Sequence, residues 1–187
     1  MISFLASFAF AYLAAALLAS GAGHLLGFIG FRDLVRAHTI VPQRLATPVA
    51  LCVLSFELVA GTIALLLAVR RGNDVGLAFL LFAATTAAGL GFVLYVRRLL
   101  QSPTAVACGC SPLTGPTTPA SLIPGAALLV ISAIAVVVVA LAPAQGAAGE
   151  VDGLVGVLPQ LWGVTLAGIV MLVPASMPAP AVTDRIA

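Results

Sequence analysis

The chain has 187 residues, of which 62% are hydrophobic and only 7% are charged, whereas soluble domains carry about 25% charged residues. A water-soluble core of this length could not bury so much apolar surface, so the composition excludes an ordinary soluble domain and predicts a membrane protein. Its formal net charge of +2 comes from eight arginines, no lysine and six acidic residues, which is too little positive charge for a nucleic-acid-binding surface.

Five apolar runs reach the length of about 20 residues that crosses a bilayer. These runs cover residues 2–23, 48–69, 75–96, 121–141 and 153–173. Because lipid offers the backbone no hydrogen-bond partners, the runs are predicted to be helices, and the absence of a period-two pattern argues against a barrel. We therefore predict an all-α polytopic membrane bundle with a four-helix core and a fifth transmembrane helix, forming one domain over 1–173. The proline-containing tail 174–187 is expected to be disordered.

The segment between the first two spans has the pattern of a short surface helix. Arg32 and Arg36 are one helical turn apart, with Leu34 and Val35 on the opposite side, and Pro42 would end the helix. Such a helix would lie in the lipid headgroup layer. A solvated loop whose arginines only touch lipid phosphate explains the same residues equally well.

Arginine is distributed unevenly between the two predicted membrane faces. Five spans place the first connection, the third connection and the C-terminus on one face, whose arginines are Arg32, Arg36, Arg44, Arg97, Arg98 and Arg185. The other face has Arg70 and Arg71, beside the acidic residues Asp74, Glu150 and Asp152. The positive-inside rule puts the first face in the cytoplasm, whereas disulfides persist outside it, so the orientation of the third connection stays open.

The third connection contains the sequence Cys108-Gly109-Cys110, in a stretch rich in Ser, Thr, Pro and Gly. A disulfide needs Cα atoms about 4.4–6.8 Å apart, which one intervening residue allows only in an unusual backbone that glycine can adopt. Such a bond would be strained and easily reduced, which favours thiol–disulfide exchange over a structural role. Metal handling, with two soft thiolates on Zn or Cu(I), and inert thiols are the alternatives.

Glu57 lies near the middle of the second span, where an ionised carboxylate must be neutralised, paired or in contact with a wet cavity. A proton- or ligand-binding site and a structural hydrogen bond inside the bundle both fit. Gly61, one turn away on the same face, would let another helix approach. We interpret Cys52, on a different face of this helix, as a small buried hydrophobic residue, and His24 as a polar cap at the end of the first span.

The sequence lacks the short motifs of common enzyme classes. It has no nucleophile-elbow, phosphate-loop, zinc-protease or dinucleotide-binding fingerprint. Nothing therefore indicates an ordinary hydrolase, kinase or dehydrogenase.

Several of these residues occur together in an order typical of a known family. In chain order they are the Gly-rich end of the first span, Phe31, Asp33, Arg36, His38, Pro42, Glu57-Leu58-Val59-Ala60-Gly61, Arg97-Arg98 and Cys108-Gly109-Cys110. With these features the chain resembles the MauE family of methylamine-utilisation membrane proteins, related to the broader DoxX-like group. The resemblance extends from about Phe28 to Ala127. The chain departs from the family pattern at Ser111-Pro112, where Phe-Gly is usual, and at Pro124-Gly125, where Arg-Asn is common.

The resemblance implies a role in maturing an exported partner, such as an amine dehydrogenase subunit, together with a thioredoxin-like redox protein. Cys108 and Cys110 would be the exchanging pair and Glu57 the intramembrane acid, giving three candidate catalytic residues. We expect no cofactor, no resident metal and no nucleic-acid partner, and we expect the lipid bilayer of a bacterial plasma membrane as the surroundings. The alternative is a non-enzymatic membrane subunit or small-molecule permease centred on Glu57.

Overall fold

The computed structural model describes residues 2–38, 40–70, 74–101 and 119–141, together with 162–163, 165–167 and 169–170. Four long helices dominate these residues: α1 (Ile2–Leu26), α3 (Ala46–Val69), α4 (Val75–Leu100) and α5 (Ile123–Leu141). Three short helices join or precede them: α2 (Phe28–Ala37), η1 (Gln43–Leu45) and η2 (Pro119–Leu122). The part of the chain that the structure describes has no strand, so the predicted all-α helical bundle is confirmed.

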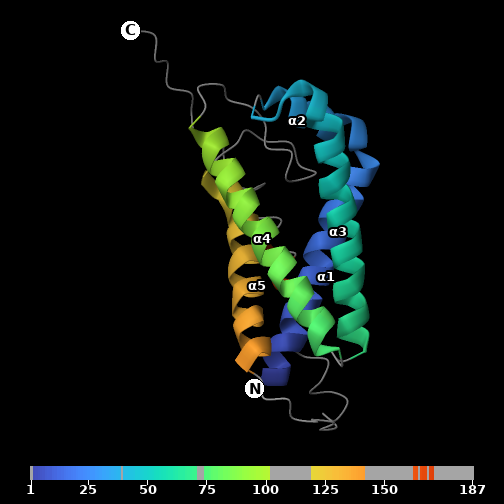
Figure 1. Ribbon diagram of the computed structural model, residues 1–187, viewed down its shortest axis with the longest axis vertical. Helices are drawn as coiled ribbons and strands as arrows, with labels where there is room; N and C mark the ends of the chain where they lie inside the picture. The colour runs from blue at the N-terminus through green and yellow to red at the C-terminus, as the bar shows by residue number, and fades with distance from the viewer. Residues whose placement is uncertain are drawn as a thin grey trace.

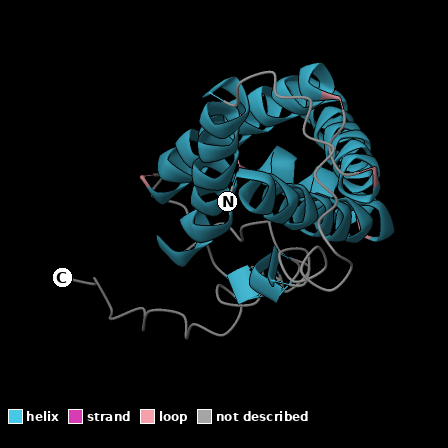
Figure 2. Ribbon diagram, turned by 90° about the horizontal axis from the view of Figure 1, so that it is seen from below, coloured by secondary structure: helices cyan, strands magenta, loops and turns pink. Residues whose placement is uncertain are grey.

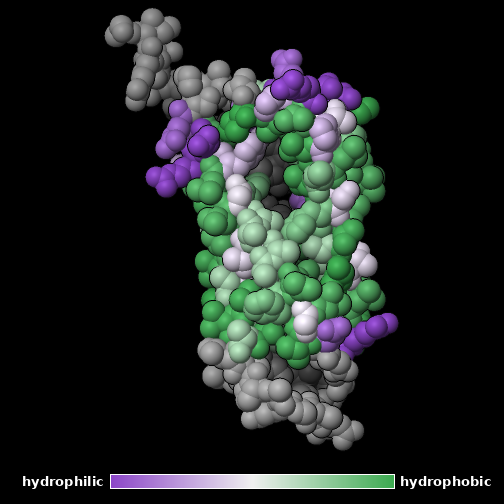
Figure 3. Space-filling model, viewed as in Figure 1, coloured by the Kyte–Doolittle hydropathy of each residue, from purple (hydrophilic) through white to green (hydrophobic). Residues whose placement is uncertain are grey.

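Four helical segments within the described residues are long and apolar enough to cross a membrane. They are Leu5–Leu26, Gln43–Val69, Val75–Leu100 and Pro119–Ala140. Large apolar side chains remain on the outside of the bundle, including Leu80 (66% exposed), Val59 (59%) and Ile134 (52%). Figure 3 shows this apolar surface over the middle of one face, with hydrophilic residues gathered toward its two ends. Such a surface is stable in lipid and costly in water, so the molecule is a multi-pass membrane protein.

The helices extend slightly beyond the spans expected from the sequence. The first continues to Leu26, the second begins at Ala46 and the third continues to Leu100. Most of the predicted fifth span, 153–173, falls outside the described residues, as does the tail 174–187. The described residues within that span are helical, with Ala167 buried and Trp162 exposed. The fifth span and the domain bounds stay predictions.

The four long helices pack as two pairs. α1 lies along α3 and α4 lies along α5, and contacts between α1 and α5 join the pairs (Figure 1). Seen along the bundle, the long helices surround a central axis (Figure 2). The core joins both pairs: Phe10 of α1 stacks on Phe82 of α4 with ring centroids 4.9 Å apart, and Leu13 is fully buried beside them. Stacked aromatic rings at this separation add to the stability given by burial.

The short helix α2 lies across one end of the bundle, against α3 (Figure 1). It buries Val35 and leaves Arg36 exposed, so the predicted surface helix is confirmed as a helix, while its place in the headgroup layer stays a prediction. Pro42 does not end it, because α2 has already ended at Ala37, and Pro42 instead precedes η1.

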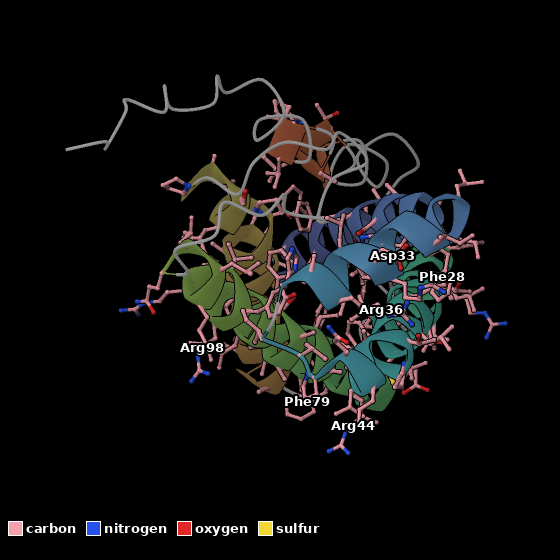
Figure 4. The ribbon with its side chains drawn as sticks, turned by 90° about the horizontal axis from the view of Figure 1, so that it is seen from above. Phe28, Asp33, Arg36, Arg44, Phe79 and Arg98 are labelled. Carbon is pink, nitrogen blue, oxygen red and sulfur yellow. The ribbon has the colours of Figure 1, made fainter. Side chains whose placement is uncertain are left out.

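Charged residues gather at the α2 end of the bundle. Five of the predicted arginines lie there among the described residues, namely Arg32, Arg36, Arg44, Arg97 and Arg98. Arg44 and Arg98 point outward from the bundle when it is viewed from this end (Figure 4). α4 ends and η2 begins at the same end (Figure 1), as expected if the first and third connections share a membrane face. At the opposite end, Asp74 caps α4 by accepting a hydrogen bond from the backbone N–H of Leu77 at 2.9 Å.

Candidate functional site

The sequence-predicted site residues have different outcomes in the structure. Cys108 and Cys110 lie outside the described residues. Glu57 lies in the middle of α3 and is 9% exposed, so it faces the interior of the bundle and not the surroundings. The described part of the predicted site is therefore the environment of Glu57.

Both carboxylate oxygens of Glu57 are hydrogen-bonded to side chains of α1. The Ser20 hydroxyl donates to Oε1 at 2.8 Å, and Nδ1 of His24 lies 2.7 Å from Oε2. The ring of His24 in turn stacks on Phe31 of α2, with centroids 3.9 Å apart and planes 14° apart. We call Ser20, His24, Phe31 and Glu57 the Glu57 cluster; it joins α1, α2 and α3.

Local sequence explains why the cluster forms. Ser20 and His24 are four residues apart on α1, so they share one face of that helix. The helices approach closely beside them: a Cβ atom at Gly21 would lie 2.9 Å from Leu58 Cδ2, and one at Gly61 would lie 2.9 Å from Leu18 Cγ. Glycine at both positions brings α1 near enough to α3 for the short serine side chain to reach the carboxylate.

The cluster is largely shielded from the surroundings. The side chains of His24 and Glu57 are 11% and 12% exposed, which makes their contact a mostly buried ion pair when the imidazole is protonated. A single buried carboxylate in a membrane is costly, and a hydrogen-bonded partner that can carry the opposite charge offsets much of that cost. Chemically, the cluster can bind, hold and release a proton. Among the described residues, no group of three histidine, cysteine or acidic side chains could hold a metal ion.

The chain matches the family model described as methylamine utilisation protein MauE over residues 2–143. It belongs to the MauE family. The match covers α1 to α5 and so includes both the Glu57 cluster and the segment with the two cysteines. It is longer than the region of resemblance inferred from the motifs, which began near Phe28. Neither the curated proteins nor the solved structures give a match.

A second polar contact in this MauE-family protein lies at the α2 end of the bundle. His38, which follows α2, is 4% exposed and its Nδ1 is hydrogen-bonded to the Tyr95 hydroxyl of α4. This pair ties the first connection to α4. Arg36 donates to Thr47 Oγ1 at 3.4 Å and thereby ties α2 to the start of α3. Figure 3 shows the surface hollowed between α3 and α4 just below α2, on the face where these elements meet.

Two interpretations made from the sequence were wrong. His24 is not a polar cap, because its ring is inside the bundle and contacts Glu57. Cys52 is not buried; it is exposed on the outer side of α3, although it does lie on a different face from Glu57 as expected. The spacing of Ser20 and His24 could have indicated a polar face on α1, but a polar pair on one helix does not reveal which helix it faces.

Proposed function

We propose that this MauE-family membrane protein supports thiol–disulfide exchange with an exported partner through Cys108 and Cys110. Two observations support the proposal: membership of a family described by methylamine utilisation, and the short Cys-Gly-Cys spacing in the connection between α4 and α5. The partner would be a protein such as an amine dehydrogenase subunit, and the location a bacterial plasma membrane.

The observation that carries the proposal is where the connection begins and ends. Gln101 follows α4 and Pro119 begins η2, and both helix ends lie at the α2 end of the bundle (Figure 1). The chain therefore leaves the bundle after α4 and re-enters it at η2 on one rim of the membrane-crossing part. Arg97 and Arg98, in the last turn of α4, lie at the same rim. A thiol pair carried between these two points would be available to water and to a protein docked on that rim.

The proposed exchange follows ordinary thiol–disulfide chemistry. The thiolate of one cysteine attacks a disulfide sulfur of the partner, whose S–S bond breaks as a mixed disulfide forms. The second cysteine then attacks this mixed disulfide, which oxidises Cys108 and Cys110 to a disulfide and releases the partner as two thiols. The two protons lost by the cysteines are taken up by the partner's sulfurs. The reverse sequence oxidises the partner, and a thioredoxin-like protein of opposite redox state resets the pair.

Covalent trapping tests this proposal. Without Cys110, a mixed disulfide formed by Cys108 cannot be resolved, so Cys110→Ala is expected to accumulate a covalent complex that dithiothreitol releases. The matched control is Cys52→Ala, which removes the exposed thiol on the outer side of α3 and should change nothing. Non-reducing electrophoresis and mass spectrometry would identify the partner. The proposal fails if neither Cys108→Ala nor Cys110→Ala traps a partner and the pair is never oxidised in cells.

The Glu57 cluster favours a second candidate function, that of a non-enzymatic membrane subunit or small-molecule permease. The supporting observation is a carboxylate held inside the bundle with both oxygens engaged by α1. This candidate predicts that Glu57→Gln abolishes function while Cys108→Ala and Cys110→Ala leave it intact. Complementation of a deletion strain by the three variants separates the candidates, because thiol exchange predicts loss with either cysteine variant.

A further inference from the structure

We propose that His24 and Glu57 together bind one exchangeable proton inside the membrane. The 2.7 Å contact between Nδ1 and Oε2 joins two groups that can each carry a proton, so the proton can move between them along one hydrogen bond. This inference stands independently of the cysteine pair, because the two residues that bind the proton lie in α1 and α3.

The hydrogen bonds of Glu57 favour a proton over a larger ligand. Oε1 already accepts from Ser20 and Oε2 is already engaged by His24, so a cation or polar solute would have to displace a partner supplied by the protein. The interface also leaves little space, since a Cβ atom added at Gly21 would lie 3.2 Å from the Cβ of Glu57. A proton adds no volume and keeps both contacts.

The charge states of the pair explain why one proton would be held. Imidazolium with carboxylate and imidazole with carboxylic acid are both neutral overall and contain the same number of protons. Removing that proton leaves a net negative charge among apolar helices, which is costly in a low-dielectric environment. The proton therefore belongs to the pair and not to one residue.

His24 is the member of the pair that lies nearer the α2 end of the bundle. It lies two residues before the end of α1, and its ring is covered by Phe31 at the start of α2. Beyond Phe31 the charged groups of α2 engage one another: Arg32 donates to Asp33 at 2.8 Å, and Arg36 lies 3.6 Å from the same carboxylate. From α4, Tyr95 is hydrogen-bonded to His38, and Arg97 and Arg98 lie in the last turn of the helix. His24 thus stands between Glu57 and the charged end of the molecule.

Spectroscopy of the protein in lipid nanodiscs tests the proposal. Infrared difference spectra recorded between acid and alkaline buffer should contain a carboxyl band that Glu57→Gln removes. Nitrogen-15 spectra of labelled histidine should contain a His24 signal, assigned by its loss in His24→Gln, that changes over the same pH interval as the carboxyl band. In Glu57→Gln the His24 signal should change at a different pH, because its coupled partner is gone.

The result that would overturn the proposal is a pair that never changes protonation while the protein stays folded; it would then be a structural hydrogen bond only. Cys52→Ala is the matched control, because Cys52 lies on the outer side of α3, away from the cluster, and this variant should retain the joint step. Circular dichroism of each variant guards against misfolding. The His38 signal in the same spectra is an internal control and should be unchanged by Glu57→Gln. Replacing Cys108 and Cys110 together should leave the proton step in place, so its failure can be told from failure of the exchange proposal.

Discussion

At the scale of single residues, Glu57 depends on side chains from a different helix. Its partners are 37 and 33 residues earlier in the chain, and both come from one face of α1. The sequence identifies Glu57, because an acid in the middle of an apolar run is conspicuous whatever surrounds it. It does not identify His24, because a histidine near a helix end is ordinary until the register between α1 and α3 is known.

Replacing His24 is expected to destabilise the protein less when Glu57 is also replaced by glutamine. His24→Ala leaves a buried carboxylate without its counter-charge, a change that costs about 3–5 kcal/mol in comparable pairs. In His24→Ala combined with Glu57→Gln the unpaired charge is gone, so the double variant should lose less than the sum of the single variants. The free energy of unfolding in mixed detergent micelles, followed by circular dichroism, measures this double-mutant cycle. Additive effects would show that the two groups are not coupled.

At the scale of secondary-structure elements, the α1–α3 interface is the most closely packed contact of the site. Two small residues, Gly21 and Gly61, face the opposite helix at distances where a Cβ atom would collide. The helices themselves were predictable from apolar length alone, since lipid requires helical backbone. The pairing of α1 with α3 was not, because small residues such as Ala and Gly occur along every span and only some of them lie at an interface.

Adding one methyl group at Gly61 is expected to disturb the Glu57 cluster. The new Cβ would lie 2.9 Å from Leu18 Cγ and 3.1 Å from the Leu18 backbone nitrogen, so α1 must shift, at a cost of about 1–3 kcal/mol. The matched control is Gly91→Ala, since nothing lies within 4 Å of a Cβ at that position of α4. Thermal unfolding in detergent compares the two variants, and equal melting temperatures would contradict the close packing of α1 on α3.

At the scale of the whole molecule, an apolar outer surface separates two charged ends. The α2 end has five of the described arginines, and the opposite end has Arg70 beside Asp74. The positions of the arginines in the sequence were sufficient to predict this arrangement, because arginines between apolar spans lie where the helices end; Glu57, inside a span, is the exception. The side of the membrane that the third connection faces was not predictable, because the arginine distribution and the persistence of disulfides point to opposite sides.

The charge distribution predicts that the α2 end faces the cytoplasm. A single cysteine introduced at Arg44 should then react with an impermeant maleimide only after the membrane is opened, whereas one at Arg70 should react in intact cells. The background for both is the chain without its native cysteines. The opposite labelling pattern would place the α2 end outside. An outside α2 end would put the connection between α4 and α5 in the compartment of an exported partner, whereas an inside one would contradict the proposed exchange with that partner.

The outer face of α3 is expected to contact lipid. Cys52 is exposed on that face, so a membrane-soluble photoactivated carbene reagent should label it in the variant without Cys108 and Cys110, while a charged maleimide, which needs a hydrated thiolate, should not. Mass spectrometry of the labelled peptide measures the difference. Equal labelling by both reagents would mean that water reaches this face of α3.

The link between α1 and α3 also has a consequence for how the chain is made. When the second span enters the bilayer during synthesis, its carboxylate needs Ser20 and His24, which the ribosome has already produced. α1 and α3 are therefore expected to leave the insertion machinery as a docked hairpin, before α4 and α5 are translated. Biogenesis would begin with the same two helices that enclose the acid, and the later pair would assemble against a finished template.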